Sequence, residues 1–249
     1  MKMVKNDKQI ESMKISGKIA ALALKKVLQN VKVGAKCIDL DKIAQDEIEK
    51  HGAKLSFPTV EDYKWATCIT INNQVVHGIP TERKLEEGDI LSIDTGALYE
   101  GFHSDMAISV PVGKVKPSTE KFLEVGRKAL EEAIKKAKPG NHIGDISATL
   151  QINIEEAGYS VVKNLTGHGI GRELHEEPMV PGFGEEGTGL KIKEGMTLAV
   201  EAIYAEGSGN IMMESDGWTI STEDGSLGGL FEKTIAVTKS GPIVLTPYL

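Results

Sequence analysis

Apolar positions in the first part of the chain recur at helical spacing. Small or apolar residues return every three or four positions across residues 10–31, with lysines between them. This spacing places the apolar residues on one face of a helix. Val33-Gly34 ends that helix, and a second helix is predicted from Asp39, as its N-cap, to Gly52.

Residues 53–112 have the shorter periodicity of strands. The segment "TCITINNQVVHGIP" alternates β-branched residues around an Asn-Asn turn, and "DILSIDTG" and "SDMAISVPVG" follow it. Two more helices are then predicted, one capped by Ser118 and one ending at Gly158. The residues from 159 onward are predicted to form strands and loops.

This order of helices followed by strands occurs twice, and the two copies align. At an offset of 106, Gly34 lies over Gly140 within two matching helical segments. At an offset of 107, "EEGDILSID" lies over "KEGMTLAVE", so Asp94 matches Glu201. Because nearly the same offset recurs across helix, turn and strand, the sequence predicts a two-fold internal repeat.

Composition and charge restrict the class of protein. The 249 residues are 40% hydrophobic and 26% charged, which is typical of a globular protein with a substantial core. A net charge of 29 − 36 = −7 argues against a nucleic-acid or anionic-membrane partner. There is no signal-peptide core, no apolar run near the ~20 residues of a membrane span, and no CxxC pair. We therefore expect a soluble cytoplasmic protein.

Two carboxylates interrupt the apolar strand patterns of the first half. Asp94 ends the apolar run Ile90-Leu91-Ser92-Ile93, and a buried charge without a partner is costly. Asp105 follows eleven residues later, so two strands with a short loop would bring both carboxylates together. Adjacent carboxylates repel unless they share a proton or bind cations. Taken alone, Asp105 is equally compatible with a turn.

The second half supplies further candidate ligands. His168 and His175 lie in "TGHGIGRELHEEP", whose glycines allow close approach of a ligand or a neighbouring chain. That string opens no βαβ unit, so it does not indicate a nucleotide loop. Glu201 and Glu232 lie in apolar, strand-like settings, although either alone could sit on an exposed strand face.

Taken together, these residues indicate a carboxylate-rich site for two metal ions. Such ions polarise a carbonyl group and activate a water molecule. Oxygen ligands with one imidazole suit Mn, Fe, Co or Zn, and the sequence does not choose among them. The candidate ligands are Asp94, Asp105, His168, Glu201 and Glu232.

At these segments the chain resembles the type I, bacterial-like methionine aminopeptidases. The strings "INNQVVHGIP", "DILSIDTGALYEGFHSD", "GHGIGRELHEEP", "GMTLAVE" and "DGWTISTEDGSLGGLFEKTIAVT" occur in that family's order. The resemblance implies the α+β pita-bread fold, in which helices of two pseudo-two-fold related halves pack on a curved antiparallel sheet. We expect one domain over residues 1–249, with halves at about 10–113 and 114–249.

The resemblance also implies a division of roles among the ligands. Asp94 would bind one of two divalent ions, Asp105 and Glu232 would bridge both, and His168 and Glu201 would complete the second. The implied reaction is hydrolysis of the bond after an N-terminal methionine when the next residue is small, by a water that bridges the metals.

Three residues would carry the catalysis implied by the resemblance. His77 and His175 would contact the substrate, and His175 would donate a hydrogen bond to the developing oxyanion. Glu201 would carry a proton from the water to the leaving amine. Substrates would be nascent polypeptides and peptide N-termini, acted on by a monomer. Transient ribosome association is left open.

The methionine pocket follows the family less closely. Tyr63, Cys68 and Trp218 occupy pocket positions, whereas Leu174 stands where many relatives have an aromatic residue. The segment "LSFPTVEDYKWATC" also departs from the family's Gly-rich version. A leucine can still line a slot for a thioether side chain. Details of side-chain selectivity therefore stay open.

Two other functions are alternatives for this sequence. A related metallopeptidase that cleaves X-Pro bonds is one alternative, but such relatives usually carry an additional N-terminal domain. The other is a non-catalytic binding member of the same fold. Such proteins typically lose metal ligands, and all five are present here.

Overall fold

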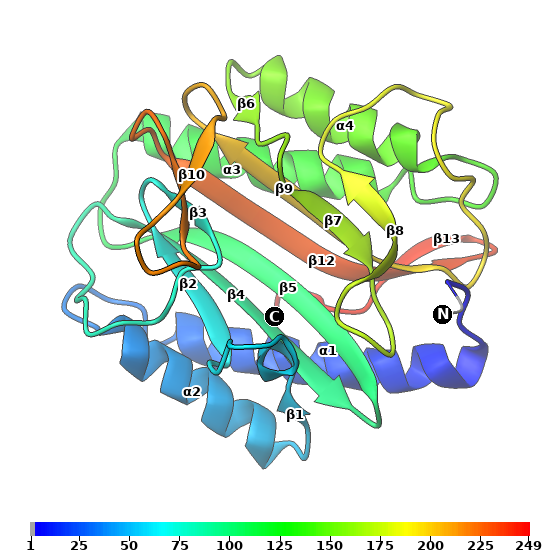
Figure 1. Ribbon diagram of the computed structural model, residues 1–249, viewed down its shortest axis with the longest axis horizontal. Helices are drawn as coiled ribbons and strands as arrows, with labels where there is room; N and C mark the ends of the chain where they lie inside the picture. Colours follow the sequence, from blue (N-terminus) through cyan, green and yellow to red (C-terminus); the bar gives the residue numbers. More distant parts are fainter. Residues whose placement is uncertain (1–2) are drawn as a thin grey trace.

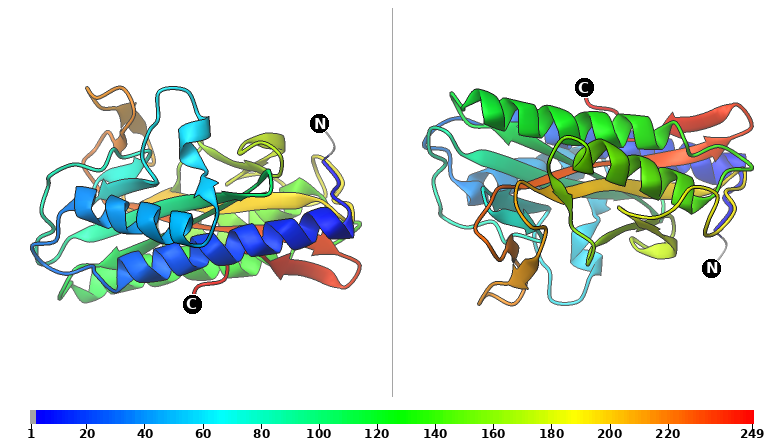
Figure 2. Two further views of the ribbon diagram at one scale, coloured as in Figure 1. Left: turned by 90° about the horizontal axis from the view of Figure 1, so that it is seen from below. Right: turned by 90° about the horizontal axis from the view of Figure 1, so that it is seen from above.

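Two pairs of helices pack against one face of a curved sheet in the computed structural model, which describes residues 3–249. The first pair is α1 (Asp7–Leu28) and α2 (Cys37–Lys50), and the second is α3 (Pro117–Ile134) and α4 (Ile143–Glu155). Figure 2 shows the helices on one side of the sheet and the longer loops on the other. The predicted α+β pita-bread architecture is confirmed.

The main sheet is antiparallel and contains ten strands among the described residues. Its central order is β1-β4-β5-β12-β9-β7-β8, and β2, β6 and β13 pair at its margins. The strands are β1 (Lys54–Leu55), β2 (Thr67–Ile71), β4 (Ile90–Tyr99), β5 (Phe102–Pro111), β6 (Ser160–Val161), β7 (Thr166–Gly169), β8 (Glu176–Pro181), β9 (Thr197–Ala205), β12 (Gly228–Thr238) and β13 (Gly241–Val244).

A smaller sheet lies beside the open face of the main one (Figure 1). It is formed by β10 (Ile211–Met213), β11 (Ile220–Thr222) and β3 (Gln74–Val76). A short 3₁₀ helix, η1 (Phe57–Thr59), precedes β2. These elements border the open face without covering it.

The two halves meet where β5 pairs with β12. Glu232 lies opposite Ala107 there, while Asp94 pairs with Ala107 and Glu201 pairs with Glu232. The four residues therefore form one row across the sheet, in the order Asp94, Ala107, Glu232, Glu201. Asp94 and Glu201 occupy equivalent places on either side, as the sequence offset of 107 predicts.

Each half has its own apolar core between helices and sheet. Leu24 of α1 and Leu40 of α2 pack with Leu91 in the first half. Phe122 of α3 and Tyr204 of β9 pack in the second half, with ring centroids 4.4 Å apart. The helices and cores thus pack against one face of the central strands, and they leave the opposite face open.

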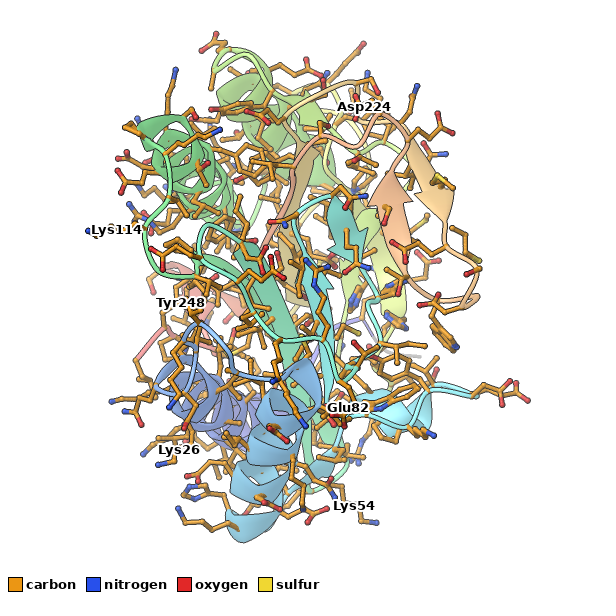
Figure 3. The ribbon with its side chains drawn as sticks, turned by 90° about the vertical axis from the view of Figure 1, so that its left-hand side faces the viewer. Lys26, Lys54, Glu82, Lys114, Asp224 and Tyr248 are labelled. Atoms are coloured by element: carbon orange, nitrogen blue, oxygen red, sulfur yellow. The ribbon has the colours of Figure 1, made fainter. Side chains whose placement is uncertain are left out.

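Charged side chains cover the outer surface. Figure 3 shows Lys26 on α1, Lys54 on the marginal strand β1 and Lys114 in the loop before α3, and all three side chains are exposed. Among residues 3–249, no helix combines the length and apolar character needed to cross a membrane.

Two predicted helix starts are wrong. Helix α2 begins at Cys37 after Lys36, and Asp39 lies in its first turn, where a carboxylate favours the helix dipole. Helix α3 begins at Pro117 after Lys116, one residue before the predicted cap Ser118. Proline suits the first helical position because its missing N–H has no partner to lose there.

The predicted position of the carboxylates within their strands also needs correction. Asp94 does not end a strand, because β4 continues to Tyr99 with β5 paired along its whole length. Glu201 likewise lies in the middle of β9. Both carboxylates therefore project from the sheet interior, where neighbouring strands fix their positions.

Candidate active site

The candidate site lies where the two halves meet, on the neighbouring strands β4, β5, β12 and β9, which can be followed in Figure 1. Asp94 on β4 pairs with Ala107 on β5, and Asp105 lies two residues before Ala107 on the same strand. Side chains two residues apart on a strand share a face, so Asp94 and Asp105 are diagonal neighbours. The predicted hairpin that brings these carboxylates together is confirmed.

The second half brings three more side chains to the same place. Glu201 and Glu232 are directly opposite each other on β9 and β12. His168 on β7 pairs with Ala199, two residues from Glu201. Its Nε2 atom lies 3.6 Å from Glu201 Oε1 and 4.0 Å from Asp105 Oδ2. The five residues predicted as ligands therefore converge, although their roles as ligands stay a prediction.

Several oxygen atoms in this cluster lack hydrogen-bond partners among the described residues. They are Oδ1 of Asp94, Oδ1 of Asp105 and Oε1 of Glu232, and each atom is buried. Buried polar atoms normally have a partner. One ligand atom each from Asp105, His168 and Glu232 lies within 4.8 Å of the other two. This donor set fits divalent cations.

The electrostatics of the cluster support the same conclusion. Burial raises the pKa of Asp94 to about 7. Burial, reinforced by the neighbouring carboxylates, also raises the pKa values of Asp105, Glu201 and Glu232 well above their usual range. Four carboxylates can be ionised together here only if positive charge is bound among them.

The His168 ring is prepared to offer a lone pair. Burial, with His175 nearby, lowers the pKa of His168 to about 4, so the imidazole is neutral near pH 7. Its Nδ1–H donates to the Gly169 carbonyl oxygen at 2.8 Å, which leaves Nε2 directed at the carboxylates. Such a backbone contact fixes the tautomer and ring orientation of a ligating histidine.

Two further histidines border the carboxylates. The rings of His168 and His175 pack edge to face with centroids 4.5 Å apart. Burial lowers the pKa values of His77 and His175, so both are neutral hydrogen-bonding groups near pH 7. His77 has a φ of 59°, a conformation that is uncommon for a non-glycine residue and that clusters at functional sites.

An apolar cavity of about 140 Å³ opens onto the carboxylates. The predicted pocket residues Tyr63, Cys68, Leu174 and Trp218 all line it. The rings of Tyr63 and Trp218 pack edge to face at 5.0 Å, which gives the cavity a rigid aromatic wall. Burial raises the pKa of Cys68 well above its usual range, so this side chain is a neutral thiol.

Sequence reasoning missed two residues of this cavity. Phe57 and Val60 line it beside Tyr63. Both belong to "LSFPTVEDYKWATC", and the departure of that segment from the Gly-rich pattern was the only signal available. The segment between β1 and β2 therefore supplies part of the pocket wall.

A second cavity of about 200 Å³ lies over the carboxylates themselves. Its lining includes Asn164 and Leu165, which no sequence pattern indicated, and Thr166, the first residue of the segment that carries His168. The two cavities share His77, Asp94, Asp105 and His175. A chain with its first side chain in the apolar cavity can thus present its first peptide bond to the carboxylates and histidines.

Comparisons with known proteins agree on one family. Residues 11–239 match the sequence pattern of metallopeptidase family M24. The chain is 41% identical to a methionine aminopeptidase of Clostridium perfringens, over 99% of each chain. It is 38% identical to methionine aminopeptidase 1 of Bacillus subtilis, also over 99% of each chain.

Solved structures give the same result. The crystal structure of a methionine aminopeptidase from Thermotoga maritima has a TM-score of 0.96, with 40% identity over 98% of each chain. A prolidase from Pyrococcus horikoshii shares the fold, with a TM-score of 0.79 at 24% identity. The present chain spans 64% of that prolidase.

Proposed function

Because the chain belongs to metallopeptidase family M24 and to its bacterial methionine aminopeptidases, we propose that it removes N-terminal methionine from peptides and newly made proteins. One observation carries this proposal. An apolar cavity lined by Tyr63, Leu174 and Trp218 opens directly onto a cluster of buried carboxylate oxygens without partners. The cavity suits the methionine side chain, and the carboxylates suit the ions that a metallopeptidase needs.

Two divalent ions among Co, Mn, Fe and Zn are the proposed cofactors. When bound, they would polarise the peptide carbonyl and activate a water molecule. Asp94 would hold one ion, and His168 with Glu201 would hold the other. Asp105 and Glu232 lie between these two groups and would bridge both ions. The unpartnered oxygens of Asp94, Asp105 and Glu232 support this assignment.

The protein's own groups would orient the substrate and move protons. The cavity would bind the methionine side chain and exclude water from it. His175 would donate an imidazole N–H to the carbonyl oxygen as negative charge develops there, and His77 would contact the substrate beside it. Glu201 would take a proton from the attacking water and pass it to the leaving amine. Burial and the nearby Asp94 carboxylate raise the pKa of Glu201 well above its usual range, which favours acceptance of a proton from the water.

The second cavity would receive the residue that follows methionine. Leu165, Thr166 and Leu230 line that cavity together with the carboxylates, and a preference for a small second residue is part of this proposal. As part of this proposal, residues 1–249 act as one domain and as a monomer. The substrates are nascent chains in the cytoplasm.

A comparison of three peptides tests the proposal. Metal-loaded protein should release methionine from a Met-Gly peptide, more slowly from a Met-Leu peptide, and leave an Ala-Pro peptide intact. Preferential cleavage of Ala-Pro would support the X-Pro alternative, to which the fold shared with the Pyrococcus horikoshii prolidase relates the chain. No cleavage by fully metal-loaded protein would support a non-catalytic binding role.

A further inference from the structure

A buried ion pair joins the beginning of the chain to the segment that carries His175. Lys5 Nζ lies 2.6 Å from Glu176 Oε2, and the two side chains are only 4% and 3% exposed. Desolvating two charges is expensive, and a buried pair often gives little net stability. A contribution to stability therefore does not by itself explain why this ion pair is buried.

Glu176 closes the turn that holds His175. Its second oxygen, Oε1, accepts hydrogen bonds from the backbone N–H groups of Arg172 at 2.7 Å and Glu173 at 3.2 Å. The side chains of Leu174 and His175 project from the residues enclosed by these bonds. One carboxylate thus fixes the loop on one oxygen and the Lys5 ammonium on the other.

Lys5 is itself anchored to both halves of the molecule. Its backbone N–H donates to the Gly195 carbonyl oxygen at 2.7 Å, just before β9. The next residue, Asn6, caps α1 by accepting from the Gln9 backbone N–H at 3.0 Å. Figure 1 shows this end of α1 beside the second half. The backbone that carries the Lys5 ammonium is therefore fixed relative to β9, the strand that carries Glu201.

The space around the pair is closely filled. A Cβ atom on Gly171 would lie 2.4 Å from Lys5 Cε and 2.8 Å from Glu176 Oε1. The Gly171 carbonyl accepts from the His103 backbone N–H at 2.8 Å, which ties the same loop to β5. At Gly171 the loop therefore packs directly against the ion pair.

We propose that Lys5 is a positioning residue that sets the place of the His175 imidazole through Glu176. This inference rests on the proposed function, because His175 must act on the substrate for its position to affect turnover. The ion pair fixes the turn at residues 172–176 against β5 and β9, so that the imidazole edge meets His168 and faces the carboxylates. Without the ammonium, the loop keeps its internal bonds and the Gly171–His103 bond to β5, but Glu176 loses its link to the beginning of the chain beside β9.

The variant Lys5→Met tests this proposal. Methionine fills similar space but removes the charge. Misplacing a catalytic group by about 1 Å costs on the order of 100-fold in rate, so kcat for a Met-Gly peptide should fall by about 10- to 100-fold. KM should change by less than about threefold. The visible absorption of the cobalt-loaded protein should be unchanged, because the ligand set is intact. Loss of that spectrum together with kcat would overturn the proposal.

Two controls separate positioning from general weakening. Lys36→Met removes an exposed ion pair, Lys36 Nζ to Glu82 Oε2 at 2.8 Å, and should leave kcat unchanged. Glu176→Gln keeps an oxygen for the two N–H groups but removes the charge, so its kcat should also fall by about 10- to 100-fold. This second variant tests the proposal if Lys5→Met does not fold. In a His175→Ala background, Lys5→Met should cost no further activity. A multiplicative loss would show that Lys5 acts elsewhere and would overturn the proposal.

A readout independent of turnover distinguishes this inference from the proposed function. The imidazole proton resonance of His175, assigned by its loss in His175→Ala, should shift in Lys5→Met and not in Lys36→Met. If wild-type protein fails to release methionine but this resonance shifts, the proposed function is wrong and the positioning contact stands. An unshifted resonance would overturn the positioning role whatever the activity.

Discussion

The hydroxyl group of Thr234 makes two hydrogen bonds to the backbone of Asp105 across the junction of the two halves. It accepts from the Asp105 N–H at 2.9 Å and donates to the Asp105 carbonyl oxygen at 2.7 Å. Ser109 makes the same pair of bonds to Leu230, each at 2.9 Å. The two contacts are equivalent about an axis between Ala107 and Glu232. Side-chain hydroxyls thus join the halves at the strands that carry Asp105 and Glu232.

Removing the Thr234 hydroxyl should weaken this junction. Thr234→Val keeps the shape but leaves two buried backbone groups of Asp105 unpaired, and each unpaired group costs about 1–3 kcal/mol. The free energy of unfolding, measured in urea, should fall by about 2–4 kcal/mol. Thr234→Ser should recover most of the loss. Equal stability of the Val variant and the wild-type protein would contradict this reading of the junction.

Removing the metal should abolish activity. A chelator should reduce methionine release to background, and adding a divalent ion should restore it. The reason is that buried carboxylate oxygens without hydrogen-bond partners would bind the ions. The release rate is measured before chelation, after dialysis and after each metal addition. Full turnover by protein shown by elemental analysis to be metal-free would rule out a metal-dependent reaction.

The metal-free protein should lose stability as pH rises. Burial gives Asp94 a folded-state pKa of about 7, above the unfolded value of 3.8, so the folded state binds more protons between these pH values. The free energy of unfolding should therefore decline from about pH 4 to about pH 7, by about 1.4 kcal/mol per unit of pKa difference. The histidine contribution has the opposite sign, because the lowered pKa of His168 favours folding as pH rises.

Comparison with Asp94→Asn isolates the carboxylate from the histidines. Both proteins are unfolded in urea without metal between pH 5 and pH 8. The variant should gain stability relative to the wild-type protein as pH rises, and added metal should reverse that order. Parallel curves for the two proteins would show that Asp94 is not held in a raised-pKa environment.

Leu174 should set the selectivity of the apolar cavity. It stands with Val60 between that cavity and a neighbouring cleft of about 580 Å³, and both residues line both spaces. Leu174→Ala should join the two and lower kcat/KM for a Met-Gly peptide by about 10- to 100-fold, because apolar contacts are worth about 1–3 kcal/mol. Peptides with a larger N-terminal side chain should lose less. The control Leu190→Ala changes an exposed leucine and should alter neither value.

Much of the fold and of the candidate site follows from local patterns and the repeat. Asp94 and Glu201 could be matched because each half contains a similar strand sequence that includes one of these carboxylates. The structure places the two residues symmetrically. Helix starts were less accessible, since Lys36 and Lys116 precede α2 and α3 without side-chain capping bonds.

Contacts between segments that are distant in the sequence could not be predicted from the sequence. The pairing of Ala107 with Glu232 depends on how the halves dock, and no local pattern encodes it. The positive φ of His77 also has no signature in a single sequence. Lys5 and Glu176 are 171 residues apart and meet only because α1 packs beside the second half.

Glu201 is predicted to transfer a proton during metal-dependent release of methionine. Glu201→Gln keeps the shape of the side chain but cannot accept the proton, so kcat should fall by at least about 100-fold. The control Glu206→Gln changes an exposed carboxylate just beyond β9 and should leave kcat unchanged. Circular dichroism and metal content establish that each variant is folded and loaded.

The most direct measurement is methionine release from a Met-Gly peptide by metal-loaded wild-type protein and Glu201→Gln, followed by mass spectrometry. The wild-type protein should convert the peptide to a product that begins with glycine, while the variant leaves it intact. Wild-type rates from the folded, metal-loaded variant would contradict the mechanism, and an intact peptide with both proteins would contradict the proposed function.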